Sequence, residues 1–230
     1  MNFDEIKQVI NSDELKSHLD SLKNALIESV KGNPDGIIQL FNSGAKLPFA
    51  VPDALFLNRL QNFISGVYQT GEDSIRLSNK LFNDENKKYS NASRVLEIIA
   101  KTDSEQKLDF VIAATRCLLC DCIDNTLYFR ITKAIVDTLY EDLVYLSDHV
   151  LEQTIHVGNQ YTRGLEKNGL MVVEVIDGNI DSEYYCVSFT TLGMQVVEYA
   201  IDVENVEKAN QLKELIEQKK FSRFGKRIAP

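Results

Sequence analysis

Apolar side chains recur every three or four residues along most of this chain, and no other feature of the sequence constrains the fold as strongly. Residues with this spacing share one side of an α-helix and form the face that the helix buries. Polar breaks rich in helix caps, Gly or Pro interrupt the pattern near residue 12 and at residues 31–36, 84–88, 101–105 and 124–126. The sequence therefore predicts a mainly helical protein whose short connections join antiparallel helices.

The composition is that of a folded globular chain. Hydrophobic residues make up 44% and charged residues 26% of the 230 residues, which is enough apolar material for a substantial core. The net charge of -9 argues against broad, charge-driven binding to nucleic acid or anionic membrane. Asp4, Glu5 and Lys7 lie where a signal peptide would be apolar, and the four Cys residues are expected to be reduced thiols. We expect a cytoplasmic protein.

Residues 36–52 are unusually apolar, with Lys46 as their single charged residue. Gly44 and Pro48 interrupt the run, which is too short for a spanning helix of about 20 apolar residues. We interpret it as a core element with a bend. The alternative is a segment that binds a membrane surface or a partner, in which Phe49 takes part.

Helices are expected over most of the region from Asp53 to Tyr140. Asp53 is predicted to cap the first of them, and Ser90 or Asn91 a later one. Another predicted helix begins near Gly71, and two more cover Lys107–Cys122 and Leu127–Tyr140.

Beyond Leu143, β-branched runs appear among the helices. Helices are predicted over residues 142–151 and 154–168, and Gly169 suits a left-handed cap. Residues 170–176 and 184–189 are predicted strands that the turn Asp177-Gly178-Asn179 joins into a hairpin. Thr190 is expected to cap a helix over 191–200, and the last helix covers 209–220.

Residues 142–201 thus follow the order helix, helix, hairpin, helix, and two stretches of them resemble the winged-helix family. GLEKNGLMVVEVIDG joins a helix to a first strand, and YYCVSFTTLGMQVVEYA ends a second strand in Thr-x-x-Gly before a helix. The resemblance implies a recognition helix over Thr154–Lys167, although winged helices bind DNA, RNA and proteins alike. An ordinary solvated face is the alternative. The candidate nucleic-acid-binding side chains on this helix are Asn159, Gln160, Thr162, Arg163 and Lys167.

The predicted fold class is therefore mainly α, with an N-terminal helical bundle followed by a winged-helix-like module that contains one β-hairpin. The predicted domains are the bundle over residues 1–141, the module over 142–207, and a C-terminal helix with a basic tail over 208–230. Acidic residues are absent from this tail after residue 217, and Phe221 and Phe224 interleave its cations. Such a peptide can contact phosphates or an acidic partner, or remain a disordered tail. Its candidate binding residues are Lys219, Lys220, Arg223, Lys226 and Arg227.

Residues 92–146 resemble a helical module of bacterial and mobile-element proteins, and abortive-infection proteins are the nearest named group. The resemblance implies a link to phage or mobile-element biology and antiviral defence, and it implies no activity. Lys101, Asp103 and Lys107 are explained by capping and surface pairing. The residues that carry the resemblance are Leu96, Ile99, Lys101, Asp103, Lys107, Ile123, Phe129, Arg130, Asp142, Leu143 and Leu146.

Three thiols lie close together in the sequence, at Cys117, Cys120 and Cys122, and thiolate clusters can bind zinc or iron-sulfur centres. On a continuous helix, however, Cys122 points about 200° away from Cys120. We therefore interpret the three as packing residues and expect no metal site and no cofactor. The three histidines, His18, His149 and His156, lie in no metal or triad spacing.

Phosphate-binding, nucleophile-elbow and metalloprotease motifs are all missing from the sequence. The first hypothesis is a non-enzymatic interaction or regulatory protein that binds a protein partner, or a second copy of itself, through its helical and winged-helix modules. The second is a DNA-binding transcriptional regulator that uses the recognition helix, and the third is a membrane-associated defence protein that uses residues 36–52. No small-molecule substrate is indicated.

Overall fold

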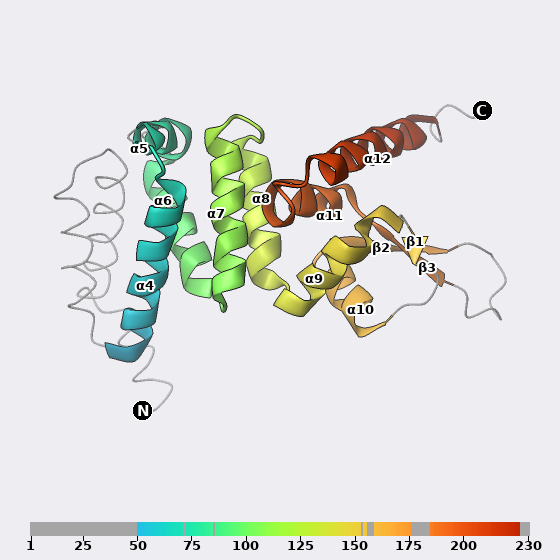
Figure 1. Cartoon of the computed structure of the whole chain (residues 1–230), viewed down its shortest axis with the longest axis horizontal. Helices are drawn as coiled ribbons and strands as arrows, with labels where there is room; N and C mark the ends of the chain where they lie inside the picture. Colours follow the sequence, from blue (N-terminus) through green and yellow to red (C-terminus); the bar gives the residue numbers. More distant parts are fainter. Residues whose placement is uncertain are drawn as a thin grey trace. The chain divides into compact units, whose positions relative to one another are not determined.

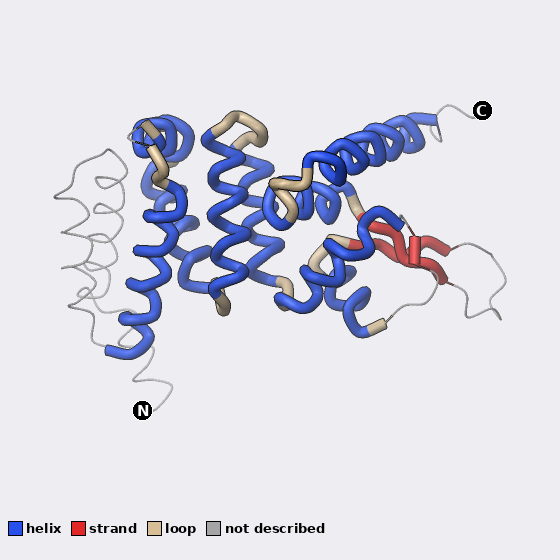
Figure 2. Tube along the Cα trace, in the orientation of Figure 1, coloured by secondary structure: helices blue, strands red, loops and turns tan. Residues whose placement is uncertain are grey.

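The computed structural model describes residues 50–70, 72–84, 86–152, 154–155, 159–175 and 185–225. The chain divides into two compact units, residues 1–102 and 103–230 (Figure 1). The described part is mainly helical and contains an antiparallel hairpin in the second unit, which confirms the predicted fold at that level (Figure 2). The predicted boundary at residue 142 lies within the second unit. The helices predicted before residue 36, and residues 36–49, lie outside the described residues.

The described part of the first unit consists of α4 (Ala50–Val67), α5 (Asp73–Leu77), the π-helix η1 (Ser78–Phe82) and α6 (Lys88–Lys101). Helix α6 packs against α4 and η1. Their shared core is apolar and includes Leu60, Phe63, Leu81 and Ile99.

Two predicted caps in this unit are wrong. Asp53 lies inside α4, which begins three residues earlier, and Ser90 and Asn91 lie inside α6, whose N-cap is Lys87. Asn91 instead joins two elements, because its Nδ2 donates to the carbonyl of Leu81 at 2.7 Å. Tertiary contact has replaced the local cap that the residue type suggested.

The helices of the second unit are α7 (Glu105–Leu119), α8 (Asn125–Asp137), α9 (Tyr140–His149), α10 (Gln160–Lys167), α11 (Thr191–Val196) and α12 (Val206–Gly225). The 3-10 helix η2 (Val150–Glu152) extends α9, and the π-helix η3 (Val197–Ile201) extends α11. The predicted cap of α11 is confirmed, since the Thr190 side chain accepts a backbone N–H bond at its start. Ser104 and Asp124, which lie in the predicted polar breaks at 101–105 and 124–126, cap α7 and α8 in the same way. Helix α7 packs against α8 and η3, and α8 against α11.

A small antiparallel sheet lies within this unit, in the order β1-β3-β2. Strands β2 (Met171–Val175) and β3 (Tyr185–Phe189) form the predicted hairpin. The helix predicted over Thr154–Lys167 is wrong at Thr154 and Ile155, which form the short strand β1 (Thr154–Ile155) instead. Thr154 and Ile155 pair with Ser188 and Val187 of β3, so a partner more than thirty residues away decides their conformation. The turn predicted at 177–179 lies outside the described residues.

The residues that carry the winged-helix resemblance meet at one junction. Gly169 has φ 74°, which confirms the predicted left-handed cap, and the N–H of Leu170 bonds back to the carbonyl of Leu165 at 2.8 Å. The Thr190 hydroxyl donates to the carbonyl of Gly169 at 2.8 Å, and its N–H donates to the carbonyl of Leu170 at 2.9 Å. Gly193 then passes so close to Leu170 that a Cβ would lie 2.4 Å from its carbonyl oxygen. The motif therefore fastens the end of α10 to the start of α11.

Lys107 is one of the buried charged residues of this unit, with 1% of its surface exposed. Its Nζ donates to the Asp103 carboxylate and to the carbonyl of Val136, each at 3.1 Å. The expected surface pairing is therefore only part of its role, because the second bond ties α7 to the C-terminal end of α8. None of the described helices is long and apolar enough to cross a membrane.

Candidate interaction face on helix α10

Helix α10 begins with a capping box. The N–H of Thr162 donates to Asn159 Oδ1 at 3.0 Å, and the N–H of Asn159 donates to Thr162 Oγ1 at 2.8 Å. Asn159 Nδ2 also donates to the hydroxyl of Tyr145 on α9 at 3.2 Å. Two N–H groups that a helix start leaves open are thus satisfied, and the start of α10 is fixed to α9.

The inner side of α10 lies very close to α9. At Gly164 a Cβ would lie 1.9 Å from a carboxylate oxygen of Asp142, so any other residue would require the Asp142 side chain to move. Asp142 is buried, and this burial, followed by the charge of Glu141, raises the pKa of its carboxyl group. Leu165, one residue further along α10, is fully buried. These contacts fix the orientation of α10 on the unit.

The outer side of α10 is polar and open to solvent. Gln160, Arg163 and Lys167 are exposed, and their spacing of three and four residues places them on one face. Glu166 is exposed beside them. We call Gln160, Arg163 and Lys167 the α10 face; it offers two cations and an amide for a partner.

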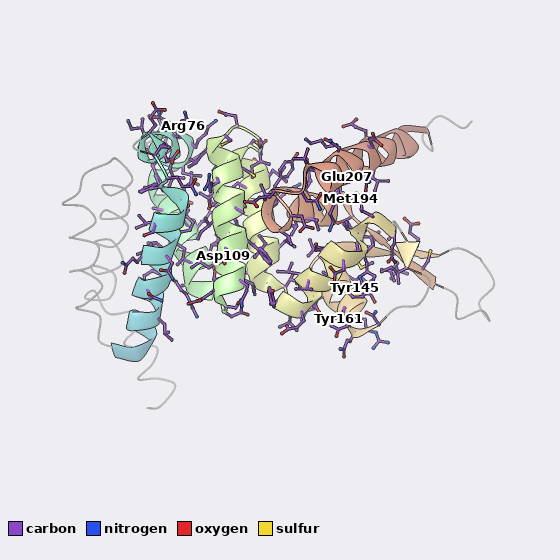
Figure 3. The ribbon with its side chains drawn as sticks, viewed as in Figure 1. Arg76, Asp109, Tyr145, Tyr161, Met194 and Glu207 are labelled. Carbon is purple, nitrogen blue, oxygen red and sulfur yellow. The ribbon has the colours of Figure 1, made fainter. Side chains whose placement is uncertain are left out.

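Three aromatic rings connect helix α10 to helix α9. Tyr145 and Tyr161, both labelled in Figure 3, stack with ring centroids 5.1 Å apart. Tyr145 also stacks on His149, with ring centroids 4.0 Å apart. All three side chains are half-buried, so the stack packs α9 against α10 while its edges remain accessible to a partner. Sequence reasoning missed it; the four-residue spacing of Tyr145 and His149 is a helix-face signal, but no local signal links Tyr161 to them.

Of the candidate residues predicted on this helix, Gln160, Arg163 and Lys167 form the α10 face, whereas Asn159 and Thr162 do not. Asn159 is half-buried and Thr162 is buried, and both serve the capping box, so they do not belong to the exposed face. Of the basic tail, Lys219, Lys220 and Arg223 belong to α12, but their side chains lie outside the description, as do Lys226 and Arg227.

A cluster that could suggest nucleophilic chemistry joins α9 to α12. Lys208 Nζ donates to Ser147 Oγ at 3.0 Å, to the Ser147 carbonyl at 2.6 Å and to Asp202 at 2.5 Å, while the Ser147 hydroxyl donates to Asp202 at 2.6 Å. These contacts use all three N–H groups of Lys208, and its Nζ forms an ion pair with Asp202. The cluster therefore fastens two helices together.

The described residues contain no group of three or more His, Cys, Asp or Glu side chains that could hold a metal ion. The four cysteines are free thiols: Cys117 and Cys186 are buried, whereas Cys120 and Cys122 are exposed.

Comparison of the chain with protein-family models, curated proteins and solved structures finds no match. The α10 face, its capping box and its contacts with α9 are therefore the features that bear on function.

Proposed function

We propose that this chain is a non-enzymatic interaction protein whose winged-helix-like module, predicted over residues 142–207, binds a protein partner through the α10 face. The order α9, β1, α10, β2, β3, α11 and the sheet order β1-β3-β2 support the winged-helix-like assignment. So does the junction formed by Gly169, Leu170, Thr190 and Gly193, because it gives the resembling residues a shared structural role.

One observation carries the proposal: the two sides of α10 differ completely. The inner side is occupied by the capping box, the close contact at Gly164 and the buried Leu165. The outer side presents only exposed polar residues, Gln160, Arg163 and Lys167. A short helix anchored on one side and polar on the other suits a recognition element on a rigid scaffold.

Charge favours a protein partner over DNA. Residues 151–230 contain nine Lys and Arg but twelve Asp and Glu, and Glu166 lies beside the two cations of the α10 face. In a DNA-binding helix-turn-helix motif the turn has about three or four residues, whereas here η2 and β1 lie between α9 and α10. An acidic or mixed-charge protein surface fits this face better than a duplex.

The test is affinity purification of the full chain from its native host, with and without nuclease. Alongside the wild type we would use Arg163→Ala/Lys167→Ala and the matched control Arg130→Ala/Lys133→Ala, which changes two exposed cations of α8. We expect a nuclease-resistant protein that the first variant loses and the control retains. Equal capture by both variants would contradict a role for the α10 face.

DNA binding is the second candidate, because Gln160, Arg163 and Lys167 are residue types that contact base edges and phosphates and they share one face. It requires recovered DNA of defined sequence and affinity that falls as salt rises. Loss of two phosphate contacts in Arg163→Ala/Lys167→Ala would reduce the salt slope by about 2. A salt slope unchanged in this variant would exclude the α10 face as the DNA contact.

Two further parts of the sequence interpretation stay proposals. The link to phage or mobile-element biology rests on the resemblance of residues 92–146 alone. Membrane association through residues 36–52 depends mostly on residues outside the description; it requires co-sedimentation with liposomes that Phe49→Ala abolishes, and absence of binding to any lipid mixture would contradict it.

A further inference from the structure

Helix α7 ends in a tight cap that brings the backbones of two of the three clustered cysteines close together. The N–H of Cys122 bonds to the carbonyl of Cys117 at 2.9 Å, and the N–H of Asp121 bonds to that of Leu118 at 3.2 Å. Asp121 takes the left-handed conformation, with φ 60°. This pair of bonds defines a Schellman motif, with Asp121 where glycine is usual.

This geometry changes the interpretation of the cysteines. A helix continued to residue 122 would separate the thiols, but α7 ends at Leu119 and the chain turns back. Side chains at the positions of Cys117 and Cys122 commonly contact each other in a Schellman motif. With standard bond lengths, the 2.9 Å bond limits their Cα separation to about 6.8 Å at most. Disulfides span Cα separations of about 4.4–6.8 Å.

The two thiols differ in access to solvent, and burial weakens the acidity of Cys117. Cys117 is 7% exposed, and burial, followed by the charge of Cys122 and then that of Cys120, raises its pKa to about 12. The charge of Glu198 on η3, which packs against α7, acts in the same direction. Cys122 is exposed, so an external reagent meets it first.

We propose that Cys117 and Cys122 form a redox-active dithiol, which a low-molecular-weight disulfide such as glutathione disulfide converts into an intramolecular disulfide across the cap of α7. The Cys122 thiolate attacks one sulfur of the reagent, whose S–S bond breaks, and the released thiolate takes up a proton. Cys117 then loses its proton and attacks Cys122 Sγ, so the second small thiol leaves. Two protein thiols are oxidised by two electrons, and the reagent is reduced to two thiols.

The acidity of Cys117 gives the second step a distinctive pH dependence. Burial keeps most of Cys117 protonated at neutral pH, also after Cys122 has formed the mixed disulfide and lost its charge. The rate of its closure should rise about tenfold for each pH unit between about pH 7 and 9, since the thiolate is the nucleophile.

The test uses two full-length variants that each keep only two cysteines. Cys120→Ser/Cys186→Ala keeps Cys117 and Cys122, and the matched control Cys117→Ala/Cys186→Ala keeps Cys120 and Cys122. Each is equilibrated with glutathione redox buffers in native solution and in urea, trapped by alkylation and analysed by mass spectrometry. Circular dichroism of the reduced variants establishes that both fold.

In the first variant we expect the equilibrium constant for disulfide closure to be at least about tenfold larger in the native state than in urea, because the cap holds the two positions together. The control should show no such gain. An equal or smaller constant in the native first variant, or a gain confined to the control, would overturn the proposal; so would wild-type protein that forms mixed disulfides only.

Discussion

Gly193 has no room for a side chain, because a Cβ there would lie 2.4 Å from the carbonyl oxygen of Leu170. Neither backbone can move freely, since the same carbonyl accepts the N–H of Thr190 at 2.9 Å. Gly193→Ala should therefore lower the free energy of unfolding by about 2 kcal/mol, as overpacked cores do. Urea unfolding of the full chain measures the change.

Gly169 provides the control, because glycine is needed there for its left-handed backbone conformation and not for lack of space. Its φ is 74°, and a Cβ would meet no atom within 4 Å. Asn tolerates the left-handed region better than Ala, so Gly169→Asn should cost less than Gly169→Ala. At Gly193 the order should reverse, since Asn is larger. The same order at both sites would contradict the steric argument.

Glu198 is a buried carboxylate whose polar neighbours are Tyr199 and Lys213, with Lys213 Nζ 3.8 Å away. Burial raises its pKa above the ordinary value of 4.5. The folded state therefore binds this proton more tightly than the unfolded state. Its contribution to stability is complete below pH 4.5 and is lost as pH rises to the folded-state pKa.

Glu198→Gln cannot acquire this charge. The free energy of unfolding of the variant minus that of the wild type should therefore increase as pH rises from about 4 to 8. Urea titrations at each pH measure the difference, with Glu214→Gln at an exposed site of α12 as the control. A difference that does not change with pH would show that Glu198 is ionised without penalty in the folded protein.

Helix α10 has only eight residues, and helices this short are unstable alone. Its stability depends on the capping box and on packing against α9. Asn159→Ala removes the cap and the bond to Tyr145, so we expect a loss of about 1–2 kcal/mol in the free energy of unfolding. Gln160→Ala, one residue further on the exposed face, should change it little. Comparable losses in both variants would mean that the cap does not stabilise the helix.

Local chemistry explains which elements could be predicted from the sequence. Ser104, Asp124 and Thr190 cap helices through bonds to residues three positions away, and Gly169 needs only its own φ, so each is visible in a short window. Strand β1 exists because β3 pairs with it, and no short window contains both.

The candidate site shows the same division. The winged-helix resemblance implied all five polar candidates of the predicted recognition helix. That Gln160, Arg163 and Lys167 remain exposed while Asn159 and Thr162 form the capping box depends on where α10 begins, which the sequence did not predict. The end of α7 was missed because Asp121, rather than Gly, takes the left-handed position. Without a glycine at that position, the sequence contained no sign of the turn that brings the backbones of Cys117 and Cys122 close together.

For the molecule as a whole, the position of the domain boundary is the feature most open to test. The second unit begins at residue 103, and α7 and α8 contribute fully buried side chains to its core, among them Val111, Leu118, Ile131 and Ile135. Helix α7 packs against η3, and α8 against α11. A chain that begins at residue 142 would expose the partners of these side chains to water.

We therefore expect a fragment of residues 103–230 to be helical by circular dichroism and to unfold in one cooperative urea transition. A fragment of residues 142–230 should lack a cooperative transition. It loses at least four buried Leu, Ile and Val contacts, each worth about 1.5–3 kcal/mol, and their sum is comparable to the roughly 5–15 kcal/mol that stabilises a domain. A boundary at residue 142 requires the opposite result. If both fragments unfolded cooperatively with equal midpoints, α7 and α8 would be dispensable to the module that presents the α10 face.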